Sequence, residues 1–242
     1  MIVWSLRFLL FCVLAAAFVY DWPWYSYAIA IALYIGVMVS FSFRIEWRIY
    51  LDSLLKQPDD SVALTFDDGP HPETTPAILD LLQHYNIKAT FFLIGEKCEQ
   101  YPELVRRIMA DGHQIANHSA THAYSISLSS RRAWRDEIER CQRQIMTIVG
   151  TAPLLFRPPY GVTTPNLSKA LADTGLTPVG WSLHSHDWTS SVSGVLKRLN
   201  TVDQGDIVLL HDSCPNTVEA LTSWLPAVSK DFDFKPVVTT RV

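Results

Sequence analysis

Two adjacent carboxylates, Asp67 and Asp68, stand where an apolar run ends and a turn begins. The run SVALTF precedes them, and Gly69-Pro70, a strong turn signal, follows them. A turn alone would account for the pair. The alternative is that the two acids do different chemistry, because one carboxylate can bind a cation while its neighbour accepts a proton.

Two histidines, His118 and His122, form a second candidate cluster in the segment HSATH. Imidazoles four residues apart can face the same way on a helical turn. They could then hold one cation, with a carboxylate as the third ligand and water in an open position. Two surface histidines would have the same spacing, so this pattern alone supports both interpretations equally.

Three more clusters follow apolar runs later in the chain. In RPPY (residues 157–160) two prolines fix the backbone and remove two donors, so the N–H of Tyr160 could be held toward a ligand. Asp187 and Trp188 end the segment HSHDW, and His211 follows the run IVLL. A stiff loop or a packed histidine could explain each cluster singly. Together they supply the parts of one catalytic site.

The elements that must position these clusters are short apolar runs alternating with amphipathic segments. Strands are predicted at residues 62–66, 89–94, 114–116, 154–156, 177–180, 207–210 and 236–240, and helices at 74–85, 102–111, 129–149, 164–173, 192–202 and 216–228. This alternation indicates parallel βαβ units in an open sheet or a barrel. Side chains at the C-terminal ends of parallel strands meet at one face, and the clusters fall at such ends.

The clusters together resemble the five ordered motifs of the polysaccharide deacetylases, also called the NodB-homology domain or carbohydrate esterase family 4. The matching stretches are TFDDGP (65–70), HSATH (118–122), RPPY (157–160), DW (187–188) and LLH (209–211). The resemblance implies an α/β fold, a distorted (β/α) barrel of the NodB-homology type. It also implies a divalent metal, zinc, with cobalt or nickel as alternatives, and hydrolysis of N-acetyl or O-acetyl groups on sugars.

The resemblance further implies a role for each matched residue. The implied metal ligands are Asp68, His118 and His122. The implied catalytic residues are Asp67 as the base that deprotonates the attacking water, His211 as the acid, Arg157 to orient the base and Asp187 to orient the acid. The implied substrate contacts are the backbone N–H of Tyr160 and the ring of Trp188.

This sequence departs from the family pattern at two positions. His184 stands three residues before Asp187, where the family usually has an aspartate, and Ala123 follows the second histidine in place of a common proline. Both changes leave the substrate and the shape of the groove open. We expect His184 and His186 to be solvated loop residues, with substrate contact as the alternative.

The N-terminal region predicts a membrane segment. Residues 22–43 contain no acid or base other than tyrosine, and about 20 apolar residues cross a bilayer. Residues 2–20 form either the first helix of a hairpin or a signal peptide, and the turn signals around Pro23 favour the hairpin. Two core helices of a soluble protein are the third possibility. The expected organisation is a transmembrane segment (1–45), a connector (46–60) and a catalytic domain (61–242).

Charge gives the expected orientation and excludes one class of partner. Arg7, Arg44 and Arg48 lie at the same side of a hairpin, which favours a cytoplasmic catalytic domain, whereas a single span or a cleaved leader would place it outside. The net charge of -4 argues against nucleic-acid binding. The four cysteines are scattered and predict no disulfide framework.

These observations predict an integral membrane hydrolase that removes N-acetyl groups from an amino-sugar-containing glycan or a lipid-linked sugar. An O-acetyl esterase is the alternative within this chemistry. A non-catalytic glycan-binding module is the alternative outside it, and loss of the base, a ligand or the acid would be its mark. The sequence identifies neither the sugar nor the oligomeric state.

Overall fold

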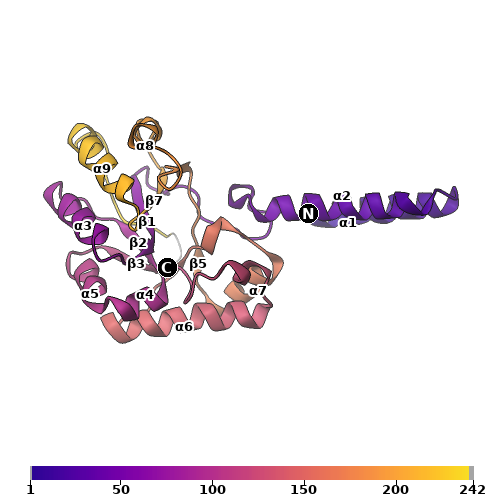
Figure 1. Cartoon of the computed structure of the whole chain (residues 1–242), viewed down its shortest axis with the longest axis horizontal. Coiled ribbons are helices and arrows are strands. Elements are labelled where there is room, and N and C mark those ends of the chain that lie inside the picture. The colour runs from indigo at the N-terminus through magenta and orange to yellow at the C-terminus, as the bar shows by residue number, and fades with distance from the viewer. Residues whose placement is uncertain (1, 240–242) are drawn as a thin grey trace.

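Seven parallel strands form the central sheet of the computed structural model, which describes residues 2–239. Neighbouring strands follow the order β5-β4-β3-β2-β1-β7-β6. Their bounds are β1 (Ala63–Gly69), β2 (Thr90–Leu93), β3 (Gln114–Asn117), β4 (Leu155–Phe156), β5 (Thr177–Pro178), β6 (Leu183–His184) and β7 (Ile207–His211). The sheet curls into a half-barrel (Figure 1), which confirms the predicted α/β fold and distorted barrel.

Helices lie around the outside of the curled sheet (Figure 1). They are α3 (Thr74–His84), α4 (Gly95–Gln100), α5 (Pro102–Ala110), α6 (Arg131–Val149), α7 (Pro165–Thr174), α8 (Val192–Leu199) and α9 (Pro215–Val228). The sequence predicts α6 well because it carries its own start and stop. The Ser130 hydroxyl accepts a hydrogen bond from the Ala133 N–H, and Gly150 ends the helix with a left-handed φ of 78°.

Strand β1 shows how the strands divide their side chains between two cores. Leu64 and Phe66 face the larger core between the sheet and the helices. Ala63 belongs to a smaller cluster on the inner side of the half-barrel. Because alternate residues of a strand share a face, Thr65 and Asp67 lie on that inner side with Ala63. The strand therefore carries Asp67 to the mouth of the half-barrel.

One predicted strand is wrong, and two short elements were not predicted. The expected strand at residues 236–240 is wrong for residues 236–239, and residue 240 lies outside the described residues. Both edges of β1 already pair with β2 and β7, so the Val237 N–H donates instead to the Thr90 side chain at 2.9 Å. The sequence also missed β6 and α4, which are too short to show a period.

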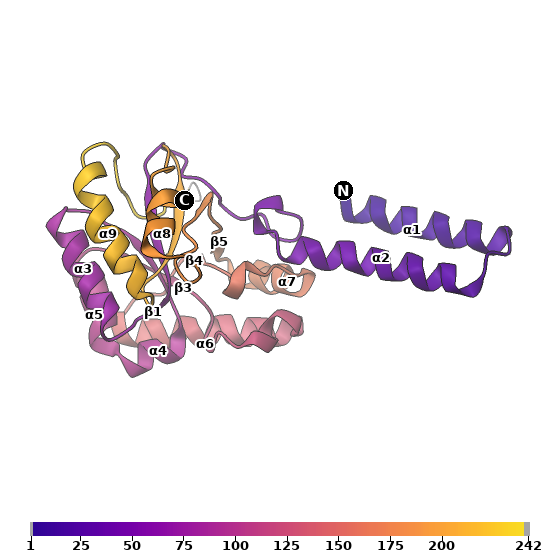
Figure 2. The same ribbon diagram turned by 45° about the horizontal axis from the view of Figure 1, so that its top comes forward.

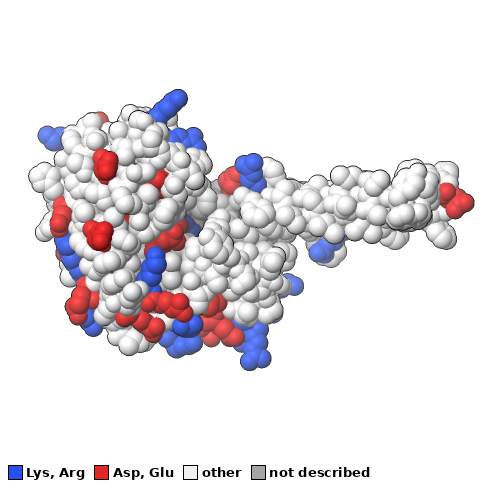
Figure 3. All heavy atoms as spheres, viewed as in Figure 1, with Lys and Arg blue, Asp and Glu red and all other residues white. Residues whose placement is uncertain are grey.

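The N-terminal region forms a helical hairpin of α1 (Ile2–Val19) and α2 (Trp24–Ser42), which extends away from the sheet (Figures 1 and 2). Ala17 is the only buried residue that the structure describes in α1, and α2 has none, so the core-helix interpretation is wrong. Both helices are long and apolar enough to cross a membrane, although a signal sequence would meet the same criterion. Figure 3 shows the hairpin largely free of charge along its length.

The base of the hairpin is built into the C-terminal unit. The Ser42 carbonyl accepts a hydrogen bond from the Thr163 N–H at 2.8 Å, and the Tyr50 hydroxyl donates to the Met38 carbonyl at 3.0 Å. Ile45, in a short 3₁₀ helix (Ile45–Trp47), is only 2% exposed. Residues of the predicted connector also form isolated bridges with the sheet region, at Leu54 and Lys56.

Candidate active site

A β-bulge at Asp68 brings the two neighbouring carboxylates to one side of the strand. The pairing of β1 with β2 shifts register between Asp67 and Gly69, and Asp68 has a φ of 71°. In a regular strand, successive side chains point to opposite faces. A bulge adds one residue and changes the direction of its side chain. Asp67 and Asp68 can therefore both face the mouth of the half-barrel.

Asp67 is paired with a buried arginine. Nη1 of Arg157 donates to Oδ1 of Asp67 at 2.7 Å and to the Thr65 hydroxyl at 2.8 Å. Its Nη2 donates to the Gly180 carbonyl at 2.7 Å, and its guanidinium lies 4.1 Å from the centre of the Phe92 ring. Arg157 is 0% exposed, so its charge depends on these partners in place of water.

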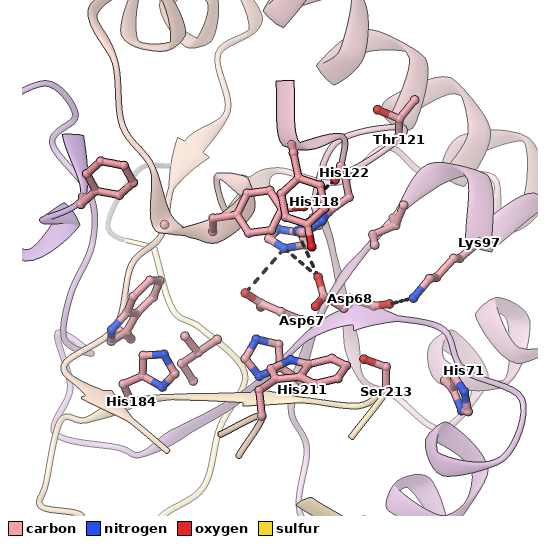
Figure 4. Close-up of a pocket in the computed structure, with 18 residues that line it drawn as sticks. Asp67, Asp68, His71, Lys97, His118, Thr121, His122, His184, His211 and Ser213 are labelled. Atoms are coloured by element: carbon pink, nitrogen blue, oxygen red, sulfur yellow. Dashed lines mark hydrogen bonds and ion pairs between the residues drawn. The ribbon is translucent and has the colours of Figure 1, made fainter. Parts of the chain in front are cut away.

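Asp68, His118 and His122 form a cluster whose ligand atoms all lie within 4.8 Å of one another (Figure 4). Nε2 of His118 is 3.4 Å and Nε2 of His122 is 3.2 Å from Oδ1 of Asp68, and this buried oxygen has no hydrogen-bond partner in the described structure. A carboxylate and two imidazoles suit a divalent metal such as zinc. The residues therefore fit the metal that the sequence predicts, while the identity of the metal remains a proposal.

The protonation states of the cluster also suit a metal. The carbonyl of Arg157 lies 2.8 Å from Nδ1 of His118 and can only accept, so Nδ1 carries the proton and Nε2 keeps its lone pair for a ligand. Burial, followed by the charge of His118, lowers the pKa of His122 to about 4. Burial alone would raise the pKa of Asp68, but the two imidazoles hold it below its ordinary value. Deprotonated ligands favour metal binding.

A second histidine–carboxylate pair lies across the pocket. Nδ1 of His211 lies 2.8 Å from Oδ1 of Asp187, and the His211 backbone N–H donates to Oδ2 at 2.7 Å. The Thr217 hydroxyl donates to the same Oδ2 at 2.6 Å. Burial alone would lower the pKa of His211, but the hydrogen bond and charge of Asp187 raise it. The pair can therefore hold a proton that faces the pocket.

The pocket that joins these groups has a volume of about 890 Å³ and aromatic walls (Figure 4). Seven of the nine predicted site residues line it: Asp67, Asp68, His118, His122, Tyr160, Trp188 and His211. The other two, Arg157 and Asp187, lie fully buried and are paired with Asp67 and His211. The structure thus brings all nine together from separate strand ends.

Residues 55–179 match the sequence profile of a family described as polysaccharide deacetylase. The chain belongs to this family. The match confirms the predicted family and, with it, the predicted enzyme class of carbohydrate deacetylase.

Named relatives agree with this assignment. A chitooligosaccharide deacetylase of Sinorhizobium fredii is 36% identical over 184 residues, which cover 69% of this chain and 85% of that protein. A peptidoglycan-N-acetylglucosamine deacetylase of Bacillus cereus is 38% identical over 179 residues, or 70% of this chain and 82% of that protein. The crystal structure of the Bc1960 peptidoglycan N-acetylglucosamine deacetylase has a TM-score of 0.71 and 34% identity, covering 76% of this chain and 89% of that one.

This member of the deacetylase family stores backbone strain around its pocket. Asp68, His122 and Tyr160 have φ values of 71°, 53° and 60°, in the left-handed region that non-glycine residues rarely adopt. Each such residue costs on the order of 1–3 kcal/mol. Contacts hold them there: the Tyr160 ring lies 4.4 Å from that of His122, and its hydroxyl donates to the His122 carbonyl at 2.9 Å.

The sequence prediction was wrong about one residue of the deacetylase site and did not identify several others. His184 is not a solvated loop residue: it lines the pocket, and its ring stacks on His186 at 4.1 Å. Trp181 also lines the pocket, and its place directly after a predicted strand could have revealed it. Lys97, whose ammonium donates to the Asp68 carbonyl at 2.7 Å, and Phe43 carry no such signal.

We predict that His118→Ala loses the bound metal, because an alanine removes one of three ligands and metal sites of this kind need all of them. Elemental analysis for zinc, cobalt and nickel in the purified full chain measures this. His184→Ala is the matched control, since His184 lines the same pocket outside the cluster, and it should keep its metal. Full metal occupancy in His118→Ala would refute the proposed ligand set.

Proposed function

We propose that this chain is a membrane-anchored, metal-dependent deacetylase that hydrolyses N-acetyl groups of an amino sugar in a glycan or a lipid-linked sugar. The observation that carries the proposal is that the two neighbouring carboxylates at the bulge have different partners. Asp67 is paired with Arg157, while its neighbour Asp68 faces two imidazoles. One acid is thus available as a base and the other as a ligand.

Asp67 serves as the general base that takes a proton from the attacking water. Arg157 holds this carboxylate in place through the 2.7 Å ion pair between Nη1 and Oδ1. The other oxygen, Oδ2, lies 3.7 Å from Nε2 of His118, so it points toward the metal cluster. A water held between them would be within reach of the base.

Asp68, His118 and His122 hold the divalent metal, for which zinc is our first choice and cobalt and nickel are alternatives. When bound, such a metal polarises the acetyl carbonyl and lowers the pKa of water. The backbone N–H of Tyr160 is the proposed second donor to the oxygen that gains charge during attack. The exposed Trp188 ring, 54% accessible, forms the wall against which the sugar lies.

His211 serves as the general acid that protonates the leaving amine. Asp187 holds Nδ1 through its hydrogen bond, which leaves Nε2 of His211 directed to the pocket. The raised pKa of His211 keeps it protonated to a higher pH. An amide needs such help because a free amine anion is a poor leaving group. This pair is why we favour N-deacetylation over O-acetyl esterase activity, which the same site could also support.

A non-catalytic glycan-binding module is disfavoured by the same residues. The proposed base, ligands and acid are all present and share one pocket. We further propose that residues 61–242 form the catalytic domain, with 46–60 as its connection to the transmembrane segment 1–45. The chitooligosaccharide and peptidoglycan substrates named for the relatives suggest an N-acetylglucosamine unit.

The hairpin is the proposed integral membrane anchor. Each helix of 18 or 19 residues would be roughly 28 Å long at 1.5 Å per residue, close to the ~30 Å hydrocarbon core. Asp21 and the tryptophans Trp22 and Trp24 lie at the far turn, and Arg44 and Arg48 lie at the base. The positive-inside rule then favours a cytoplasmic catalytic domain.

We predict that Asp67→Asn lowers the release of acetate from chitotetraose by about 10²–10⁴-fold, the usual contribution of a general base. The metal content, measured by elemental analysis, should stay near normal because Asp67 is outside the ligand cluster. Circular dichroism must show an unchanged fold, since the variant leaves Arg157 buried without its anion. A folded, metal-loaded variant with wild-type turnover would reject Asp67 as the base.

We predict that Asp187→Asn moves the alkaline limb of the kcat/KM profile to lower pH. The acid must be protonated, so activity falls as pH rises through the pKa of His211. Asp187 raises that pKa, and an asparagine removes the charge that does so. The matched control is Asp231→Asn, which removes an exposed acid outside the pocket lining and should leave the limb in place. An unmoved limb in Asp187→Asn would contradict the assignment of His211.

We predict that a reporter fused after the C-terminal Val242 is active when it requires the cytoplasm and inactive when it requires the exterior. The reason is that a hairpin returns the chain to the side on which it started, and the arginines at the base of the hairpin favour the cytoplasmic side. Paired cytoplasm-dependent and exterior-dependent reporters on the full chain provide the measurement. Activity of the exterior-dependent reporter alone would overturn the cytoplasmic orientation and favour a leader or a single span.

A further inference from the structure

The active-site pocket and the apolar hairpin share a residue. Phe43, which directly follows the last residue of α2, lines the same pocket as Asp67 and His118. It also ends the apolar segment that the sequence predicts to cross the membrane. If α2 spans the bilayer, one wall of the pocket therefore stands where the hydrocarbon core meets the headgroups.

The fold fixes this wall in place. The Ser42 carbonyl accepts a hydrogen bond from the N–H of Thr163. Thr163 lies two residues after Gly161, which lines the pocket. Ile45 is buried, and its side chain lies beside Gly180, the residue whose carbonyl accepts from Arg157. The pocket consequently keeps one orientation to the hairpin axis, and the hairpin sets its orientation to the bilayer.

An apolar groove runs along α2 toward the same point. It has a volume of about 470 Å³ and is lined by Ile29, Ala32, Leu33, Gly36, Val37 and Ser40. A side chain at Gly36 would meet no atom within 4 Å, so the missing side chain itself helps to create the hollow. All lining residues come from α2 and are exposed, so in the proposed anchor the groove is open to the surrounding lipid.

Residues of the groove and Phe43 of the pocket wall follow one stripe of the helix surface. Ile29, Leu33, Gly36, Ser40 and Phe43 are spaced by four, three, four and three residues, which places them on one stripe. From Ile29 to Phe43 the stripe spans roughly 21 Å at 1.5 Å per residue. One end of the stripe lies at the depth of lipid chains and the other in the wall of the catalytic pocket.

We propose that the substrate is a lipid-linked N-acetylated amino sugar, whose sugar enters the pocket while its apolar chain lies in the α2 groove. This inference rests on the proposed deacetylase function and specifies its substrate class. A soluble glycan could use the metal cluster, but it would gain nothing from the groove. A lipid-linked sugar is held in the same bilayer as the enzyme, which raises its effective concentration at the pocket.

Exposed aromatic side chains at the base of the hairpin and the pocket fit a membrane surface. Trp47 is 50% exposed beside the end of α2, and Tyr124, stacked on Tyr160 at 5.0 Å, is 86% exposed. The guanidinium of Arg44 lies 5.6 Å from the centre of the Trp47 ring. Tryptophan and tyrosine are enriched at headgroup depth, where a lipid-linked sugar presents its head.

The test compares two substrates that carry the same sugar. The full metal-loaded chain is placed in lipid nanodiscs and given N-acetylglucosaminyl diphosphoprenol in the same bilayer or chitotetraose in solution. We expect kcat/KM to favour the lipid-linked substrate. A Cβ at Gly36 meets no atom within 4 Å, so the Gly36→Leu side chain can extend into the groove. It should lower the ratio of the two kcat/KM values by about tenfold through lost apolar contact.

Ala28→Leu is the matched control, because it adds the same side chain to an exposed position of α2 outside the groove lining. Its ratio should stay at the wild-type value. The inference is overturned if chitotetraose is the better substrate, if Gly36→Leu leaves the ratio unchanged, or if both variants lower it equally. The last result would mean that any added bulk on α2 disturbs the anchor. Acetate release from neither substrate would instead refute the proposed function itself.

Discussion

The structure depends on placing two negative charges side by side at the end of a buried strand. A regular strand would separate Asp67 and Asp68 onto opposite faces, and one of them would enter the apolar core. The bulge at Asp68 avoids this by turning both to the mouth of the half-barrel. Two carboxylates at one mouth then repel each other, so each needs a separate partner of opposite charge or a ligand role. Arg157 meets the first requirement, and the two imidazoles that could share a metal with Asp68 meet the second.

The buried arginine makes distant parts of the chain depend on one another. Its guanidinium reaches Thr65 and Asp67 on β1, the carbonyl of Val179 after β5, and the carbonyl of Gly180. Strand β5 is at one edge of the sheet and β1 is four places away, so one guanidinium joins strands that do not pair with each other. A buried cation with a missing partner is strongly destabilising. The same guanidinium thus fixes the position of Asp67 and joins separate strands of the curled sheet.

The sequence predicts most of this site because parallel strands deliver their C-terminal ends to one face. Residues directly after predicted strands, such as His118, Arg157 and His211, therefore could be expected to meet. The remaining features depend on tertiary structure. The bulge at Asp68 exists only relative to β2, and β6 consists of two residues that pair with β7. From the sequence, Phe43 is only the end of an apolar segment. In the structure, the hydrogen bond between the Thr163 N–H and the Ser42 carbonyl places Phe43 beside the pocket. Local sequence patterns predict which residues lie at the ends of strands. They do not predict which distant segments complete the wall of the pocket.

The contact between Phe43 and the pocket bears on how the proposed membrane anchor would affect substrate selection. A catalytic domain on a flexible tether would sample many orientations, and its pocket would meet soluble and membrane-bound glycans alike. Here the connecting segment is held by the domain at several points. Ile45 is buried, the Tyr50 hydroxyl donates a hydrogen bond to the Met38 carbonyl in α2, and Leu54 forms a β-bridge with Val179 at the sheet edge. If the hairpin spans the bilayer as proposed, the pocket has one orientation to it. The entropic cost of aligning the pocket with a lipid-linked sugar would then be met during folding instead of during each encounter. Rigid attachment of the hairpin would thus contribute to the proposed substrate selection, because the contacts that hold the hairpin to the domain also decide which way the Asp68–His118–His122 cluster faces relative to it.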